Sequence, residues 1–145
     1  MMRSMKPRIT VITLGVEDLE RAVDFYANGL GLPTAGVIGK EYEFGAVAFF
    51  DLENGLKLAV WPRASIANDT GIAHSANSST EMTIGQNVNT KEEVDAGMSK
   101  AAAAGAKIIK PAHDTFWGGY SGYFQDPDGH IWELVYNPDL LVEEA

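Results

Sequence analysis

Apolar and polar residues alternate near the end of the chain in a pattern that predicts two β-strands joined by a tight turn. The turn is the Asp-Pro-Asp-Gly segment 126–129, in which proline fixes a φ angle and glycine supplies a left-handed position. In the strand that follows, Glu133 shares one face with apolar residues, and Leu134 lies on the opposite face. A carboxylate in such a strand is a candidate metal ligand, an acid–base group, or an acid paired by a neighbour.

A β-rich segment followed by a helix occurs twice earlier in the chain. The first helix is expected over 18–28 and begins at Asp18, a favourable N-cap residue. The second is expected over 90–104 and begins with a capping box formed by Thr90 and Glu93. Helical spacing predicts that the second helix buries four of its residues: Val94, Met98, Ala101 and Ala102.

The turn pattern is repeated as well, because a strand, turn and strand at 49–61 place Gly55 where the later segment has Gly129. We therefore predict an α+β fold made of two βαβββ units, with curved mixed sheets around a shared cleft in one domain spanning 1–145. The expected boundaries are about 8–62 for unit one, about 63–80 for a polar linker, and about 81–138 for unit two.

Two motifs carry a family resemblance, namely GVEDLERAVDFYANGLGL after the first strand and FQDPDGHIWEL near the end. They resemble the vicinal oxygen chelate superfamily, which includes glyoxalase I, fosfomycin-resistance proteins, extradiol dioxygenases and bleomycin-resistance proteins. The resemblance covers roughly residues 8–138 and implies the same pair of βαβββ units. It implies no single activity, because this fold supports unrelated chemistries.

The composition is that of a chain able to bury its own core, with 145 residues of which 46% are hydrophobic. A net charge of −9 argues against a nucleic acid or an anionic membrane as partner, and no stretch is long and apolar enough to span a membrane. The chain has no cysteine, which excludes disulfides and is consistent with a cytoplasmic location.

The metal site that the resemblance implies is largely missing from this chain. Metal-using relatives place ligands on the first and last strands of each unit, and the matching positions here hold Val11, Ala59, Thr83 and Glu133. One carboxylate cannot hold a divalent cation against water, because such sites use several protein ligands. We therefore expect no bound metal and no cofactor.

The histidines do not restore the ligand set. His130 beside the turn glycine is expected to be a solvated turn residue, His74 falls in the polar linker, and His113 falls in a loop. None lies on a strand that is expected to carry a ligand.

The lining of the expected cleft favours an organic ligand. Small residues at the former ligand positions leave volume, and the loop 113–120 adds aromatic side chains with Gly118 and Gly119 as flexible points. The alternative is that these aromatic residues cover a sheet edge or a dimer interface. The candidate ligand-binding residues are Thr13, Trp61, Thr83, Phe116, Trp117, Tyr120, Tyr123 and Glu133.

Glu133 is the candidate catalytic residue, since an unpaired carboxylate in apolar surroundings is suited to proton transfer. The alternative is a structural role, in which Glu133 pairs with Lys57 or accepts hydrogen bonds from Thr13, Thr83 or Tyr123.

Two functions remain open. The first is a metal-independent binding protein of the bleomycin-resistance type, which holds an apolar or aromatic small molecule between two protomers of a homodimer. The second is a glyoxalase-like lyase or isomerase that uses Glu133 as a general base or as a metal ligand. A homodimer would cover the open sheet edges, with Leu140, Leu141 and Val142 across the interface.

Overall fold

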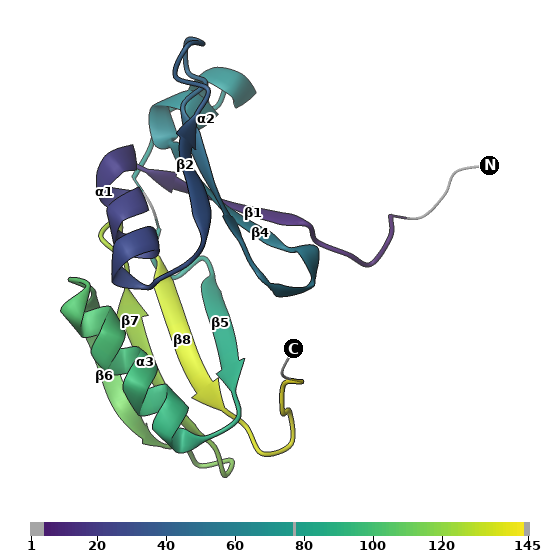
Figure 1. Cartoon of the computed structure of the whole chain (residues 1–145), viewed down its shortest axis with the longest axis vertical. Coiled ribbons are helices and arrows are strands. Elements are labelled where there is room, and N and C mark those ends of the chain that lie inside the picture. Colours follow the sequence, from purple (N-terminus) through teal and green to yellow (C-terminus); the bar gives the residue numbers. More distant parts are fainter. Residues whose placement is uncertain (1–4, 77, 144–145) are drawn as a thin grey trace.

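Two sheets of four strands each form the framework of the computed structural model, which describes residues 5–76 and 78–143. In unit one the strand order is β1-β4-β3-β2, and in unit two it is β5-β8-β7-β6 (Figure 1). β1 pairs with β4 and β5 pairs with β8 in parallel, and the remaining pairs are antiparallel. The strands are β1 (Val11–Val16), β2 (Thr34–Ile38), β3 (Val47–Asp51), β4 (Lys57–Pro62), β5 (Thr83–Val88), β6 (Lys107–Asp114), β7 (Tyr120–Gln125) and β8 (Ile131–Tyr136). The repeated topology confirms the predicted α+β fold.

Both predicted helices are present. The first consists of α1 (Leu19–Val23) and a π-helix, η1 (Asp24–Gly29), and the second is α3 (Lys91–Ala103). The side chain of Asp18 accepts a hydrogen bond from the Arg21 amide at 3.0 Å, and that of Thr90 accepts from the Glu93 amide at 3.1 Å. These bonds confirm the two caps, each of which satisfies an amide that the first helical turn leaves free.

Three local features differ from expectation or add to it. The polar stretch after unit one begins with a helix, α2 (Arg63–Thr70), which no apolar periodicity indicated. In α3, Val94, Met98 and Ala101 are buried as predicted, but Ala102 is exposed. A short 3₁₀ turn, η2 (Glu53–Gly55), joins β3 to β4.

The two matching turns use glycine in the same way. Gly55 has a φ of 79° and Gly129 a φ of 87°, both in the left-handed region that an L side chain reaches only at a cost. The repeat that the sequence predicted therefore extends to the backbone conformation of the turns.

One continuous core joins the two units on the side of the sheets that carries the helices. Tyr26 from η1 lies between Phe50 of unit one and Trp132 of unit two, with ring centroids 5.7 and 5.9 Å away. Leu134 packs so closely against α3 that a Cβ atom added to Gly97 would lie 2.5 Å from a Leu134 methyl carbon. This contact confirms that Leu134 faces the helices.

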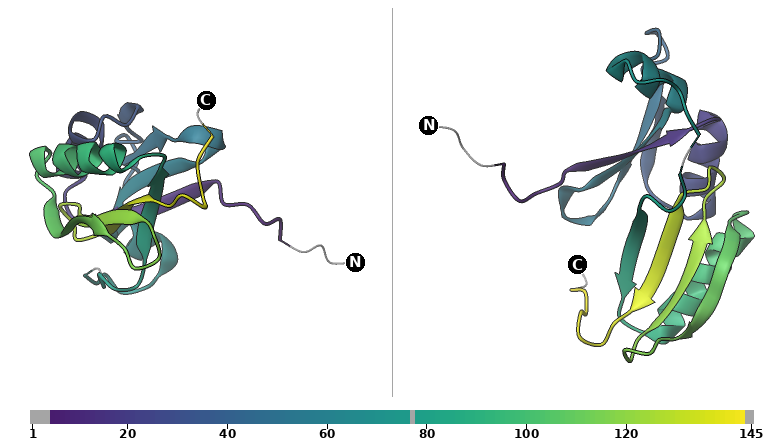
Figure 2. Two further views of the ribbon diagram at one scale, coloured as in Figure 1. Left: turned by 90° about the horizontal axis from the view of Figure 1, so that it is seen from below. Right: turned by 180° about the vertical axis from the view of Figure 1, so that it is seen from behind.

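The opposite face of each sheet is not covered by α1 or α3, as Figures 1 and 2 show. On unit one, α2 packs against the end of β1, where a Cβ atom added to Gly15 would lie 3.0 Å from the Arg63 side chain. Large apolar side chains are exposed there or beside it, including Val11 at 42%, Phe49 at 36% and Trp117 at 41%. We call this side of the two sheets the open face.

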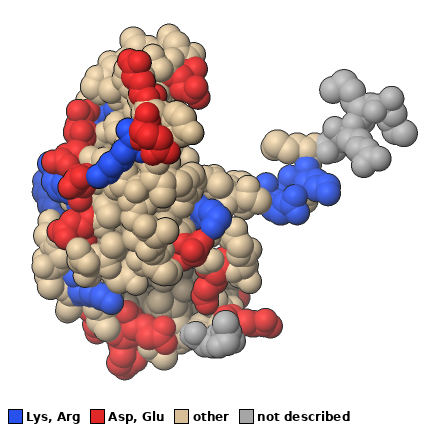
Figure 3. Space-filling model, turned by 45° about the horizontal axis from the view of Figure 1, so that its top comes forward, with Lys and Arg blue, Asp and Glu red and all other residues tan. Residues whose placement is uncertain are grey.

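Acidic side chains, 20 in the sequence against 11 basic ones, are prominent at both ends of the surface drawn in Figure 3. Within residues 5–76 and 78–143, no helix has the length and apolar character that crossing a membrane requires.

Candidate ligand site

The turn before β8 connects the two units through side chains as well as through the core. Asp126 is buried, and its carboxylate accepts hydrogen bonds from the Tyr26 hydroxyl at 2.6 Å and from the amides of Asp128 and His130 at 2.9 and 2.8 Å. Burial, followed by the negative charge of Asp126, raises the pKa of Tyr26 well above its ordinary value. Tyr26 therefore remains a hydrogen-bond donor across the physiological pH range.

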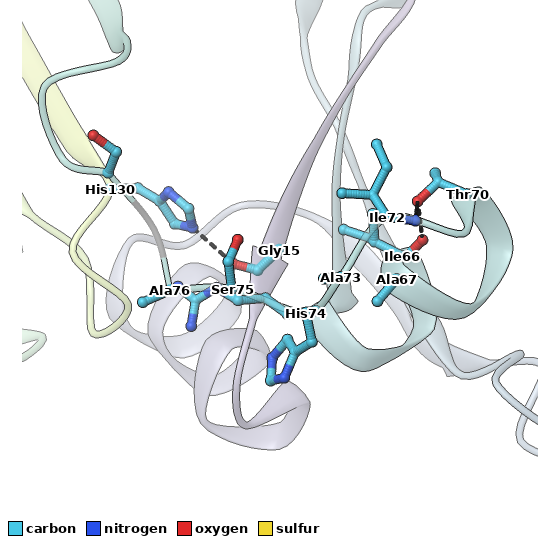
Figure 4. Close-up of a pocket in the computed structure, with 12 residues that line it drawn as sticks. Gly15, Ile66, Ala67, Thr70, Ile72, Ala73, His74, Ser75, Ala76 and His130 are labelled. Carbon is cyan, nitrogen blue, oxygen red and sulfur yellow. Dashed lines mark hydrogen bonds between the residues drawn. The ribbon is translucent and has the colours of Figure 1, made fainter.

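Asp128 and His130 bind the first unit directly. Asp128 Oδ1 accepts from the Glu17 amide at 3.0 Å and from Arg21 Nη2 at 3.2 Å. His130 Nε2 lies 2.9 Å from the carbonyl oxygen of Gly15, which can only accept, so Nε2 carries the hydrogen (Figure 4). His130 is thus not the solvated turn residue expected from the sequence. The sequence could not indicate this contact, because it depends on unit one packing beside the turn.

Figure 4 shows the hollow next to this junction, which has a volume of about 410 Å³. Arg63 and His74, which line it, both contact the carboxylate of Glu17, at 2.9 and 3.2 Å. Hydrogen bonding from Arg63 is the main cause that lowers the pKa of Glu17, and His74 adds to it. Arg63 and His74 therefore already have a partner in Glu17.

A second hollow, of about 340 Å³, lies on the open face of unit two beneath the loop between β6 and β7. It brings together four of the residues that the sequence selected, namely Phe116, Trp117, Tyr123 and Glu133. It also has five residues that the selection did not include: Lys110, His113, Asp114, Thr115 and Ser121. We call this space the aromatic-loop hollow.

Strand register explains why these side chains converge. Tyr123 pairs with Lys110 on β6 and with Glu133 on β8, so the three residues form one row across the sheet. Ser121 pairs with His113 in the next row, so His113 lies in β6 and not in the loop expected from the sequence. Irregular register in β6, between Lys110 and His113, places both on the lining although they are three positions apart. Simple alternation along the sequence could not have indicated this.

Glu133 is half-buried, and the structure shows where two of its expected partners lie, Lys57 and Tyr123. Lys57 forms its ion pair with Asp51, so it does not neutralise Glu133. Burial, and then the charge of Glu133, raises the pKa of Tyr123 above its ordinary value. Tyr123 is therefore a protonated donor beside the Glu133 carboxylate at neutral pH.

The other four selected residues lie elsewhere. Thr13 is exposed on β1, and Trp61 donates its indole N–H to the Phe44 carbonyl oxygen at 3.1 Å. The Tyr120 hydroxyl donates to Asp95 of α3 at 2.6 Å, which places Tyr120 on the helix side of the sheet. Thr83 lines a third and larger hollow.

That third hollow, of about 790 Å³, lies between the units on the helix side. Its walls are mostly leucines and other apolar residues from both units, including Leu30, Leu52, Leu56 and Trp132. Thr83 is the residue that the sequence selected among those walls. Glu133 and the aromatic loop line the separate aromatic-loop hollow.

Comparison with known proteins assigns the family. The sequence model of the Glyoxalase/Bleomycin resistance protein/Dioxygenase superfamily matches residues 8–134. The chain belongs to this superfamily. A glyoxalase-related enzyme from Fulvimarina pelagi is 35% identical, with a TM-score of 0.76 over 91% of this chain and 89% of that chain.

Two further solved structures share the fold. A lactoylglutathione lyase from Agrobacterium tumefaciens is 22% identical, with a TM-score of 0.67 over 93% of this chain and 97% of that one. A fosfomycin resistance protein from Listeria monocytogenes, solved with Mn(II) and a dihydroxypropylphosphonic acid, is 24% identical, with a TM-score of 0.70 over 92% and 94%. At these identities the similarity establishes the fold alone.

The metal that members of the superfamily use does not fit the residues present here. Glu133 pairs with Gly85 on β5, and Ala59 pairs with Thr13 on β1, so these paired positions add no ligand. His113 and Asp114 line the same hollow as Glu133, but Asp114 is already paired with Lys91. Among residues 5–76 and 78–143, no group of three or more His, Asp or Glu side chains is placed to hold a metal ion. One carboxylate falls short of the several ligands that a divalent cation requires.

Proposed function

We propose that the chain is a small-molecule-binding protein of the glyoxalase/bleomycin-resistance type, which holds an apolar or aromatic ligand without a resident metal ion. The observation that carries this proposal is the aromatic-loop hollow, where Phe116, Trp117 and Tyr123 surround a concave space beside Glu133. Aromatic walls with a few directed polar groups are typical of small-molecule sites.

The aromatic loop has the properties of a binding surface. Phe116 is fully exposed and Trp117 is 41% exposed, so both rings leave area that a ligand can cover. Gly118 has a φ of 94°, a conformation that favours glycine at the end of the loop. A ligand that covered these rings would bury apolar area, which is the main source of affinity for such molecules.

A homodimer is part of the proposal. The open face of each unit exposes Val11, Phe49 and Trp117, and the C-terminal segment exposes Leu140 and Leu141 at 58% and 60%. A second copy would remove these side chains from water. Trp61 lies on the same face of its sheet as Ala59. In such a dimer, this open face of one protomer covers the aromatic-loop hollow of the other.

The alternative function is a glyoxalase-like lyase or isomerase in which Glu133 abstracts a proton. The observation that favours it is the protonated Tyr123 hydroxyl next to Glu133, because a donor at that place stabilises a developing oxyanion. Turnover of 2-oxoaldehyde hemithioacetals that is abolished in Glu133→Gln would establish this alternative over binding alone.

A ligand screen on Trp117 tests the binding proposal. A panel of aromatic compounds is titrated against the protein, with intrinsic fluorescence and calorimetry as readouts. We expect Trp117→Ala to weaken binding about tenfold or more with little loss of stability, because an exposed ring contributes little to the core. Ile72→Ala, at another exposed apolar position, is the matched control. If Trp117→Ala unfolds the protein but leaves affinity unchanged in the folded fraction, the loop belongs to the core or an interface.

A further inference from the structure

Two side chains of opposite charge lie in the aromatic-loop hollow without an ionic partner. Lys110 on β6 and Glu133 on β8 both line it, and neither takes part in the ion pairs found among the described residues. The other acid on the lining, Asp114, is paired with Lys91 at 2.9 Å. One positive and one negative charge are therefore available to a ligand.

The spacing of the two charges is set by the sheet. Tyr123 on β7 lies between Lys110 and Glu133 in register, so two strand spacings separate their backbones. Neighbouring strands are about 4.8 Å apart, which puts the two positions about 10 Å apart across the sheet. That separation is comparable with the length of one aromatic ring carrying a substituent at each end.

The surface between the charges is aromatic. Tyr123 lies in the middle of the row, and its raised pKa keeps the phenol neutral between the ammonium and the carboxylate. Trp117 and Phe116 line the same hollow from the loop. A flat ring between the charges therefore meets aromatic side chains, which favour stacked or edge-on contacts.

We propose that the aromatic-loop hollow selects a flat aromatic molecule with an acidic group at one end and an amine at the other. The acidic group lies at Lys110 and the amine at Glu133. This inference rests on the small-molecule-binding function proposed above and specifies the class of its ligand. An uncharged ring would cover both charges without pairing either, and removing water from an unpaired charge is costly.

Four small probes that share one ring test the charge selection. They are 4-(aminomethyl)benzoic acid, benzylamine, benzoic acid and benzyl alcohol, titrated separately by calorimetry and by ligand-observed NMR. We expect the zwitterion to bind about tenfold or more tightly than either singly charged probe, and benzyl alcohol to bind most weakly.

Variants assign each end of the ligand. Lys110→Gln should lower the affinity for the zwitterion to that of benzylamine, and Glu133→Gln should lower it to that of benzoic acid. Lys107→Gln removes the same charge from the same strand outside the hollow, and should change nothing. Because Lys110 is exposed, Lys110→Gln should fold normally. It therefore still tests the charge selection if Glu133→Gln fails to fold.

The outcomes separate this inference from the proposed function. If all four probes bind equally and Trp117→Ala weakens them all, the charge selection is wrong and the binding function stands. If none of the four binds to the folded protein, the charge selection is also wrong, and the wider aromatic panel decides the function. Equal loss of affinity in Lys107→Gln and Lys110→Gln would show a general effect of net charge and would overturn the assignment of Lys110.

Discussion

The hydroxyl of Tyr26 donates a 2.6 Å hydrogen bond to the carboxylate of Asp126, although 100 positions separate the two residues in the sequence. The same hydroxyl accepts from the indole N–H of Trp132 at 3.1 Å. The bond joins the helix of unit one to the turn that precedes the last strand of unit two. It lies in the core, where a polar group without its partner is costly.

Removing this hydroxyl should destabilise the protein without disturbing either unit locally. We expect Tyr26→Phe to lower the free energy of unfolding by about 2 kcal/mol, because Asp126 loses a buried donor. Urea unfolding followed by circular dichroism measures the change. Tyr42→Phe, at a tyrosine that is 71% exposed, should be neutral. An equal effect of the two variants would show that the Tyr26 bond contributes no net stability.

Tyr26 should also make the free energy of unfolding fall as the pH rises in the alkaline range. The unfolded chain loses the Tyr26 proton near pH 10, whereas the folded pKa is raised above that value. Above the unfolded pKa the unfolded state binds fewer protons, so stability falls as pH rises toward the folded pKa. Unfolding curves from about pH 8 to about pH 11 should fall more steeply for the wild type than for Tyr26→Phe. The raised pKa values of Tyr120 and Tyr123 act in both proteins and cancel in this comparison. Parallel curves would contradict the prediction.

The contact between Gly97 and Leu134 predicts a coupled pair of core substitutions. Leu134→Ala should cost about 2–5 kcal/mol through the cavity it leaves. Gly97→Ala should cost about 1–3 kcal/mol by overpacking, because the new Cβ would lie 2.5 Å from Leu134. In the Leu134→Ala background, the same change should become neutral or stabilising, since space is free and alanine favours the helix. A double-mutant cycle measured by urea unfolding tests this, with the exposed Ser99→Ala as control. Additive effects would mean that the two side chains do not compete for space.

Metal content tests the expectation that the ligand set is incomplete. We expect the purified protein, dialysed after incubation with Zn²⁺, Ni²⁺, Mn²⁺ or Fe²⁺, to retain well below one metal ion per chain. Glu133 is the one carboxylate among the four family positions, and weak binding follows from too few ligands. Elemental analysis provides the measurement. Stoichiometric metal that disappears in Glu133→Ala but persists in Glu53→Ala would refute the prediction.

Assembly is tested on the open face. Light scattering at micromolar concentration should give about twice the 15.7 kDa mass of one chain. Phe49→Glu, on the open face of unit one, should yield monomers because it places a charge in the interface. Ile72→Glu introduces the same charge at an exposed position outside the sheets and should leave the dimer intact. A wild-type mass equal to that of one chain would reject the dimer.

Local chemistry made much of the fold readable from the sequence. Asp18 and Thr90 cap helices, and Gly55 and Gly129 form matching turns, because each choice depends on neighbours only a few residues away. The helix α2 was missed because it shows no apolar stripe. Half of the selected site residues meet in one hollow. Tyr120 does not, because its neighbour Ser121 faces the hollow and adjacent residues of a strand face opposite sides of the sheet.

The sequence by itself determined the two units, the turn before β8 and the solitary carboxylate Glu133, since short-range periodicity and turn chemistry specify these features. The tertiary structure decided which distant groups meet. Strand register placed Lys110, Tyr123 and Glu133 in one row. The packing of the units brought Asp126 and His130 into hydrogen bonds with unit one. Register and the packing of one unit against the other depend on contacts between residues far apart in the chain, and no local pattern encodes those contacts.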